Sequence, residues 1–477
     1  MQHKAAFHGF SCRQGRQYHC VVIWNIAAYG ITAARCRRRR TSSATDPPIV
    51  PIGAAGVVVL NDMESINEFY CSRHGVNRSA EAIFFELTRG TMGMSNLDGK
   101  EWTENRSFSM RVFRDLGFGK TSMEQHIMEE LQELVRQISD TTGSLIPVLD
   151  YMIPSMSNVI AALLFGRRLE LGDAKRDYVA KHLRRLLDGL NAGPVVEDKP
   201  KWLCRVTTAL PFTRLGLMRR SRLMLQEFIK DQIREHESTL HPDINRDYID
   251  GYLKKMMERH SEPVSSFQEN YLLGNTVESL VGGSGPSSFR VFWLLHVCAQ
   301  NPITVQSRIQ KEIDNVVGHR RRPTWQDRKA MPFTMACLQE ILRWKSLTPV
   351  GNQRGVLEDT FIGGYLIPKG STVLLNSMGV HRNQEHWESP DEFDPSRFLT
   401  NDDTNLAKKY DHFVPFGLVP VHCPVSPTTG IQSVSMLAFR QHLVRVSPVF
   451  RSTRGGWGAE MVVSSTVVFL VGWSALL

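Results

Sequence analysis

The stretch that decides the fold is "FTMACLQEILRWKSL" (333–347), which predicts a helix. Glu340 and Arg343 stand at i and i+3 in it and therefore share one helical face. Such a pair is ordinarily an exposed ion pair worth roughly a few tenths of a kcal/mol. The later segment "EFDPSRF" (392–398) brings Arg397 and with it a second interpretation. In that interpretation a buried Glu340 is shared by Arg343 and Arg397, which would tie the two segments together.

The rest of the chain is dominated by helical periodicity, with short strand-like runs near both ends. Apolar residues recur at helical spacing in 123–140, 221–238 and 302–317, and a short helix from Met63 to Gly75 is expected. "GVVVLND" (56–62) reads as a strand and turn, and "DTFIGGYLIPKGSTVLLNS" (359–377) reads as a hairpin. The pattern predicts a mostly α fold with small β-sheets. It contains no glycine-rich phosphate loop, so nucleotide hydrolysis and Rossmann dehydrogenase chemistry have no support.

The charge and the cysteines exclude other classes. The net charge is +9, but residues 1–45 hold eight Lys and Arg with no acid, whereas the body is nearly neutral. A neutral body offers no electrostatic footprint for nucleic acid, so no nucleic-acid partner is expected. The eight cysteines include no CxxC pair, which argues against a zinc site and against a disulfide framework.

The N-terminal segment 1–45 combines an apolar run, "CVVIWNIAAYGITAA" (20–34), with the basic block "RCRRRR" (35–40). A proline-rich hinge follows at 46–56. This arrangement is typical of a signal anchor with its basic end in the cytosol. The run is short for a full span, and an acid-free, Arg-rich leader also fits a mitochondrial transit peptide or a disordered tail.

Two further features could carry chemistry. In "WTENR" (102–106), Trp102 and Arg106 stand at i and i+4, where an indole N–H beside a guanidinium would receive a carboxylate. The same pattern also occurs as an exposed aromatic–basic pair. In "YDHFVPFGLVPVHCPVSP" (410–427), Cys423 lies in an apolar loop, where a lone thiol is either inert or a metal ligand.

Taken together, the order Trp-x-x-x-Arg, Glu-x-x-Arg, Asp-Pro-x-Arg-Phe and a Cys seven residues after Phe416 resembles the cytochrome P-450 haem-thiolate monooxygenases. The segments "NLDGKEWTENRSFSMRVFRDLGFGKTSMEQHIMEE" and "SLTPVGNQRGVLEDTFIGGYLIPKGSTVLLNSMGVHRNQEHWESPDEFDPSRFL" resemble the animal microsomal family-2 clan. The resemblance covers residues 57–417, the expected catalytic domain. It implies that Trp102 and Arg106 bind a haem propionate, and that Cys423 is the axial ligand of the haem iron. It also implies that Glu340, Arg343 and Arg397 form a structural triad.

The chain departs from the family pattern at four places. The haem loop has Val419, Val421 and Val425 where the family has Gly, a basic residue and Gly. The segment 280–302 has Gly285 and Pro286 where the family has an acid and Thr, leaving Ser287 as a substitute hydroxyl. The tail 418–477 replaces most of the haem loop and the terminal helix, and its apolar end reads as a tail anchor or as a shifted reading frame. At the other end, "PPIVPIG" (47–53) runs almost directly into "VVVLND" (57–62), where family members have further residues. We therefore expect a cytochrome P-450 fold that is incomplete at both ends.

The resemblance implies a haem-dependent monooxygenase that oxidises a small lipophilic substrate with dioxygen. Its electrons would come from an NADPH-dependent reductase at the cytosolic face of the endoplasmic reticulum, the microsomal membrane. The alternative location is the mitochondrion. The alternative function is a catalytically defective or non-enzymatic relative, which the departures favour.

Overall fold

The structure is a computed structural model of the full chain. It describes residues 50–52, 55–78, 91–117, 121–141, 145–191, 201–262, 265–318, 320–407, 410–418, 446–447 and 460–463. The expected anchor at 20–34, Cys423 and most of the tail 418–477 lie outside these residues.

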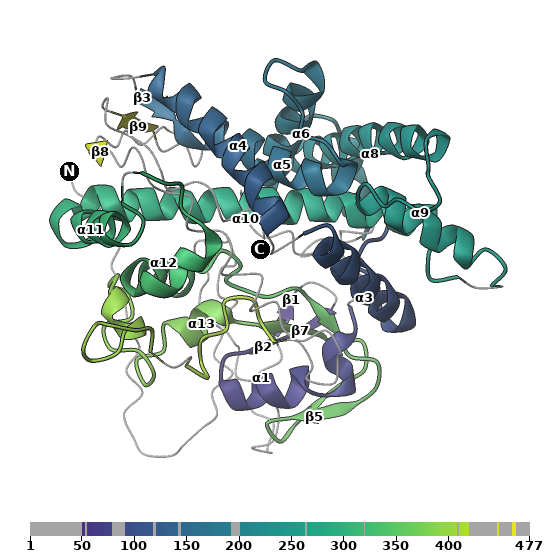
Figure 1. The fold of residues 1–477 in the computed structure, drawn as a ribbon. Coiled ribbons are helices and arrows are strands. Elements are labelled where there is room, and N and C mark those ends of the chain that lie inside the picture. The colour runs from purple at the N-terminus through teal and green to yellow at the C-terminus, as the bar shows by residue number, and fades with distance from the viewer. Residues whose placement is uncertain are drawn as a thin grey trace.

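A helical body surrounds one long helix, α10 (Glu269–Gln300), which crosses the middle of the molecule (Figure 1). The helices α4, α5, α6 and α8 lie on one side of α10, and α3, α12, α13 and the main sheet lie on the other, while α9 lies at one end of α10 (Figure 1). The other helices are α1 (Met63–Tyr70), α3 (Gly99–Asp115), α4 (Thr121–Ser139), α5 (Val148–Phe165), α6 (Ala174–Asn191), α7 (Lys201–Ala209), α8 (Arg214–Ser238), α9 (Tyr248–Glu258), α11 (Ser307–Val316), α12 (Pro332–Trp344) and α13 (Ser377–His381), with short helical turns η2 (Arg73–Val76), η3 (Pro302–Gln306), η4 (Trp325–Ala330) and η5 (Pro395–Phe398).

Three small sheets complete the described part of the chain. The largest has the strand order β1-β2-β7-β4, and the others are the β5-β6 hairpin and the set β3-β9-β8. Their strands are β1 (Val50–Ile52), β2 (Ala55–Leu60), β3 (Leu145–Pro147), β4 (Arg354–Gly355), β5 (Thr360–Ile362), β6 (Tyr365–Ile367), β7 (Thr372–Leu375), β8 (Val446–Ser447) and β9 (Glu460–Val463). The prediction of a mostly α fold with small sheets is confirmed.

The hairpin predicted at 359–377 is correct only in its first part. Gly363 and Gly364 both have positive φ, which glycine adopts without strain, and they form the turn between β5 and β6. The turn at Gly370 then directs β7 away from the hairpin. β7 instead pairs in parallel with β2, with Val57 opposite Thr372, so it joins the two ends of the domain. A sequence pattern does not specify that partner, because parallel pairing is non-local.

Two predicted helices differ in their ends. The helix expected to reach Gly75 ends at Tyr70, because Ser72 accepts a hydrogen bond from the backbone of His74 and caps the separate turn η2. The helix expected over 302–317 begins as the π-type turn η3, since Pro302 cannot donate to the preceding turn. The helix predicted over 221–238 lies within α8. Those predicted over 123–140 and 333–347 correspond to α4 and α12, which end earlier, at Ser139 and at Trp344.

The loop before α3 packs directly against α10 at two glycines. A Cβ on Gly274 would lie 2.1 Å from the carbonyl oxygen of Met92, so the two backbones touch there. Beside this contact, the Met94 amide donates to Asn275 Oδ1 at 2.8 Å and the Ser95 amide donates to Glu278 Oε2 at 2.8 Å. The segment that leads into Trp102 is therefore fixed by α10.

We expect Gly274→Ala to destabilise the protein by about 1–3 kcal/mol, because the added methyl group must displace a backbone carbonyl. Gly282→Ala is the matched control on the same helix, where a Cβ would meet nothing within 4 Å. That change should stabilise by up to about 1 kcal/mol, because alanine is the better helix former. Thermal unfolding of the two variants gives the comparison, and equal midpoints would contradict the packing contact.

Candidate functional site

The Glu–Arg–Arg triad (Glu340, Arg343, Arg397) is assembled in the structure. Glu340 and Arg343 are both fully buried on α12, and the Arg343 guanidinium donates to both Glu340 carboxylate oxygens, at 2.7 and 2.6 Å. Arg397, on η5, places its Nε 3.6 Å from Glu340 Oε1. Burial raises the pKa of the Glu340 carboxyl, while the Arg343 guanidinium opposes that rise. The geometry therefore corresponds to a buried Glu340 shared by Arg343 and Arg397, and not to an exposed ion pair.

The remaining donors of Arg343 connect α12 to the segment that follows α13. Nη1 donates to the carbonyl oxygens of His381 and Pro390, each at 2.8 Å, and Nη2 donates to that of Glu392 at 3.1 Å. The Asp394 amide donates to Glu340 Oε1 at 3.0 Å. One buried ion pair thus orders the irregular chain between α13 and η5, and that chain has little regular structure to stabilise it.

Trp102 and Arg106 lie on one face of α3, as their spacing predicts. The Trp102 side chain is buried, and the Arg106 guanidinium carbon is 5.6 Å from the centre of its ring. Leu97, Val76, Met92 and Tyr271 pack around Trp102. The indole is therefore a rigid platform beside a cation.

The structure adds two arginines that sequence reasoning missed. Arg78 and Arg354 form an antiparallel backbone bridge. Burial lowers the pKa of Arg354, and the charge of Arg106 lowers it a little further. We call Arg78, Arg106 and Arg354 the arginine cluster. Burial and then the Arg354 charge lower the pKa of Arg78 to about 9. In the sequence, each of the two missed arginines stands alone among uncharged neighbours, "GVNRSA" and "GNQRGV", which is only a weak signal of burial.

The arginine cluster has the properties of an anion site. Nε and Nη1 of Arg78 and Nε of Arg354 are buried and have no hydrogen-bond partner among the described residues. Asp98 accepts a hydrogen bond from the Arg78 amide, and burial raises the pKa of its carboxyl although Arg78 opposes that rise. Buried guanidinium groups without acceptors are costly. A ligand with carboxylate oxygens fits this set of donors.

The middle of α10 cannot relay protons in the manner that an acid–Thr pair would. A Cβ on Gly285 would lie 2.4 Å from Leu187 Cδ2, so a leucine side chain occupies the place of an acid. Pro286 continues the helix but has no N–H. Ser287 is fully buried, and its Oγ has no partner among the described residues. A role for Ser287 stays a prediction.

One turn further along α10, Arg290 contacts Phe416 in the described segment 410–418. Its guanidinium carbon lies 5.7 Å from the centre of the Phe416 ring, and burial lowers the pKa of Arg290 to about 9. Phe416 is the residue from which Cys423 is counted, but Cys423 itself lies outside the described residues. Of the described cysteines, Cys298 and Cys337 are inert core thiols, since burial raises the pKa of Cys298 to about 12 and raises that of Cys337.

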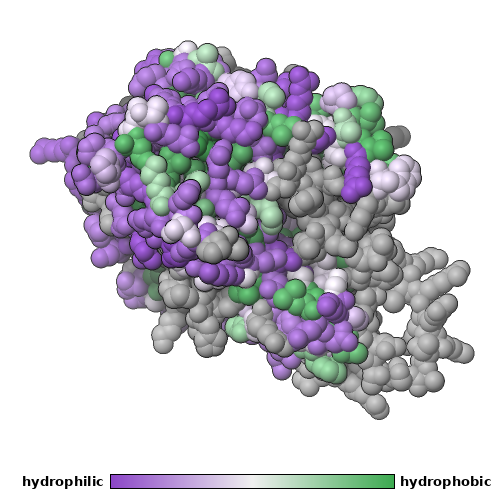
Figure 2. Space-filling model, turned by 90° about the vertical axis from the view of Figure 1, so that its right-hand side faces the viewer, coloured by the Kyte–Doolittle hydropathy of each residue, from purple (hydrophilic) through white to green (hydrophobic). Residues whose placement is uncertain are grey.

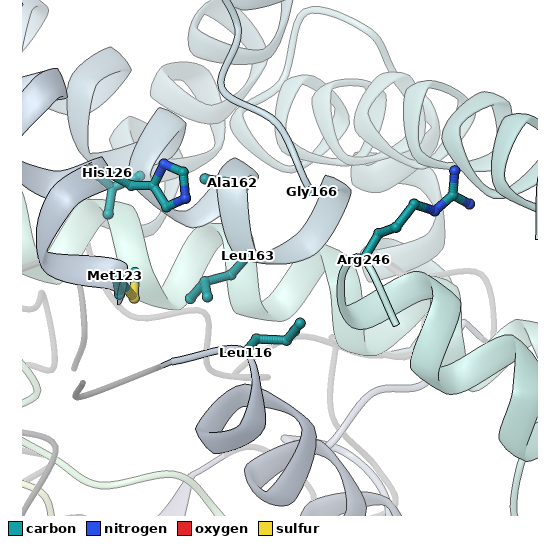
Figure 3. Close-up of a pocket in the computed structure, with 8 residues that line it drawn as sticks. Leu116, Met123, His126, Ala162, Leu163, Gly166 and Arg246 are labelled. Atoms are coloured by element: carbon teal, nitrogen blue, oxygen red, sulfur yellow. The ribbon is translucent and has the colours of Figure 1, made fainter. Parts of the chain in front are cut away.

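Two other features are separate from this site. A cavity of about 80 Å³ between α4 and α5 is lined by residues such as Met123, Leu163 and Arg246 (Figure 3). It is far smaller than a pocket for a drug-sized ligand, which holds roughly 300–1,000 Å³. His236 and Asp247 approach to 2.7 Å near Asp250, but Asp250 is paired with Arg246 and Asp247 caps α9. These contacts join the end of α8 to the start of α9, so these three residues are explained by structure without a metal ion.

Comparisons with known proteins agree with the motifs. Residues 48–424 match the family model for cytochrome P450. Cytochrome P450 2F2 of Mus musculus is 32% identical over 375 residues, which cover 77% of this chain and 74% of that protein. Cytochrome P450 2J3 of Rattus norvegicus is 33% identical over 370 residues, covering 76% of this chain and 71% of that protein. Cytochrome P450 2J5 of Mus musculus is 31% identical over 376 residues, which cover 77% of this chain and 72% of that protein.

We expect Glu340→Gln to lower the free energy of unfolding by about 3–5 kcal/mol, because it leaves Arg343 buried without a counter-charge. Glu133→Gln is the matched control, since Glu133 and Arg136 have the same i, i+3 spacing on an exposed face of α4. Its cost should stay below about 1 kcal/mol. Urea unfolding measures both, and equal costs would show that the triad is no more structural than a surface pair.

Proposed function

The chain belongs to the cytochrome P450 family, and we propose that its own reaction is the oxidation of a small lipophilic substrate with electrons from an NADPH-dependent reductase. The family is haem-dependent and catalyses monooxygenation, so the cofactor is iron protoporphyrin IX. The observation that carries the proposal for this chain is the pair Arg78 and Arg354 of the arginine cluster, whose buried Nε atoms lack acceptors within the described part of the chain.

The residues of the cluster fit the two propionates of haem. Arg78 and Arg354 would donate to propionate oxygens through the nitrogen atoms that have no partner in the described chain. Arg106, positioned by the buried Trp102 ring, would donate beside them. Cys423 is proposed as the axial thiolate, and the bound haem would supply the oxidising chemistry. The triad on α12 would hold the chain segment that precedes this loop.

A second candidate is a non-catalytic relative, and one contact favours it. Leu187 occupies the space beside Gly285, and Pro286 has no proton to donate, so α10 itself offers no relay at these positions. Val419, Val421 and Val425 also replace two glycines and a cation of the haem loop. In this case the chain would bind haem weakly or turn over slowly. Haem uptake separates the two candidates.

We further propose that the protein acts at the surface of the endoplasmic reticulum membrane, with the mitochondrion as the alternative location. Figure 2 shows hydrophobic side chains in separate patches on a mainly hydrophilic face. On α7 and the turn that follows it, Trp202 and Phe212 are 65% and 77% exposed. Exposed aromatic residues next to the basic start of α8 suit an interfacial contact. The apolar helix α5 is long enough to span a membrane by composition but is mostly buried in the protein, as a core helix is.

The haem proposal is tested by spectroscopy and by equilibrium binding. Reduced protein with carbon monoxide should show the thiolate-type Soret band, and Cys423→Ala should abolish it. Arg78→Met and Arg354→Met should each weaken haem binding by roughly tenfold or more, because each removes a charged hydrogen bond.

Arg111→Met, which alters an exposed residue of α3, is the control and should leave haem affinity unchanged. Absence of haem uptake by the natural sequence would support the non-catalytic relative. Unchanged affinity in both cluster variants would remove the assigned role of the arginines.

The membrane proposal predicts that phospholipid vesicles protect residues 201–212 from amide hydrogen exchange. Replacing Trp202 and Phe212 by Ser should reduce that protection, since each aromatic side chain contributes roughly 1.5–3 kcal/mol when it leaves water. Phe361→Ser is the matched control, because Phe361 is 64% exposed on the β5–β6 hairpin. Equal protection in all three proteins would contradict a membrane contact at α7. This measurement does not depend on whether residues 20–34 span the bilayer.

A further inference from the structure

His381, at the end of α13, is fully buried and uses both of its ring nitrogen atoms. The Val414 amide donates to Nε2 at 3.0 Å. Because a backbone amide can only donate, Nε2 carries a lone pair, and the single proton of the neutral ring lies on Nδ1. Nδ1 lies 2.9 Å from Ser346 Oγ, which therefore accepts from it. The two contacts together define a neutral imidazole in one tautomer.

The ring is one link in a chain of hydrogen bonds that all run in the same direction. The chain passes from the Val414 amide through His381 to the Ser346 hydroxyl. That hydroxyl then donates to the carbonyl oxygen of Arg343 at 3.2 Å. Arg343 in turn donates through Nη1 to the carbonyl oxygen of His381 at 2.8 Å. The imidazole therefore joins the segment 410–418 to the end of α12, the helix that carries two members of the triad.

The surroundings of His381 oppose a second proton on its ring. The charged groups that face it are the Arg343 guanidinium on α12 and the His412 ring on the segment 410–418. The Glu340 carboxylate pairs with Arg343 and leaves His381 without a counter-charge among the described residues. Burial and then these two positive groups lower the pKa of His381 to about 3. A proton on Nε2 would also face the Val414 N–H, so protonation must break that hydrogen bond.

A second pair of imidazole rings lies on the same segment. His412 stacks on His386, with ring centroids 4.5 Å apart and ring planes 15° apart, and Trp387 meets His412 edge-on at 4.8 Å. Two parallel imidazoles at this distance repel each other if both are protonated. Burial and then the His386 charge lower the pKa of His412, whereas Asp411 opposes that change. Acid therefore adds unfavourable positive charge at two places along the segment 410–418.

We propose that His381 is a positioning residue for the segment 410–418, and that it acts only as a neutral imidazole, so that acid releases the segment. The inference rests on the proposed role of Cys423, which follows this segment in the sequence. The closed segment excludes the proton, whereas an opened segment binds it with the ordinary histidine pKa of about 6.5. The attachment is therefore complete well above about pH 6.5, and it weakens progressively as the pH falls below that value.

Amide hydrogen exchange of the purified full chain measures this attachment. Protection of the 410–418 amides, corrected for the intrinsic exchange rate, should fall roughly thirtyfold between about pH 7.5 and pH 5.0, because the opened segment binds one additional proton. Amides of α5, which contains no histidine, should change less than about threefold over the same range. An equal fall in α5 would overturn the proposal, because the release would then be global unfolding.

Two variants of His381 and one control separate its titration from its packing. His381→Gln retains an acceptor for the Val414 amide but does not titrate, so the fall in protection should shrink to less than about threefold. His381→Phe removes the acceptor and should leave the segment unprotected at both pH values. His126→Gln alters an exposed histidine of α4 and should behave like the natural sequence. A full fall in His381→Gln would overturn the proposal and assign the acid response to the stacked imidazoles.

The carbon monoxide spectrum of the haem-loaded protein connects the segment to Cys423. Its thiolate-type Soret band should be lost in acid with the same pH dependence, and His381→Gln should extend the band to lower pH by roughly one unit. Equal acid sensitivity of the band in His381→Gln and the natural sequence would overturn the positioning role. Absence of haem uptake would remove the proposed function instead, and the exchange experiment would still decide how the segment is attached.

Discussion

The fold depends on one buried ion pair, between Glu340 and Arg343 on α12. A salt bridge in the interior adds little net stability compared with an apolar pair, because both charges must lose their hydration. Its value here lies in the other bonds that Arg343 makes, to three carbonyl oxygens between His381 and Glu392. This stretch is largely irregular, and without those bonds the buried carbonyl groups of His381 and Pro390 would lose a donor. The pair thus specifies the path of the chain toward the segment that ends at Phe416 and Gly417.

The helix α10 plays the complementary role on the other side of the site. Through Gly274, Asn275 and Glu278 it fixes the loop that leads into α3, and that loop in turn packs around Trp102. The Trp102 ring lies beside the Arg106 guanidinium, whose charge reaches Arg354 on a strand of the main sheet. Three distant parts of the sequence therefore meet at the arginine cluster, so the site is a product of tertiary packing.

The difference between local and tertiary contacts explains which features the sequence could predict. Helices such as α4 and α12 carry a regular apolar stripe, and local periodicity is enough to identify them. The i, i+3 and i, i+4 pairs on α12 and α3 follow from helix geometry alone, although their burial does not. The parallel pairing of β7 with β2 and the approach of Arg78 to Arg354 are non-local, and no local pattern encodes them.

Buried arginines in this chain therefore fall into two groups that the sequence does not distinguish. Arg343 has acceptors for its donors within the protein, and it contributes to the architecture. Arg78, Arg354 and Arg222 each retain buried donor atoms without acceptors in the described chain. Evolution tolerates such groups where a ligand completes them, since an apolar side chain would otherwise be more stable at the same position. The unmatched donors of Arg78 and Arg354 are thus the physical reason to place an anionic group of the cofactor at the arginine cluster.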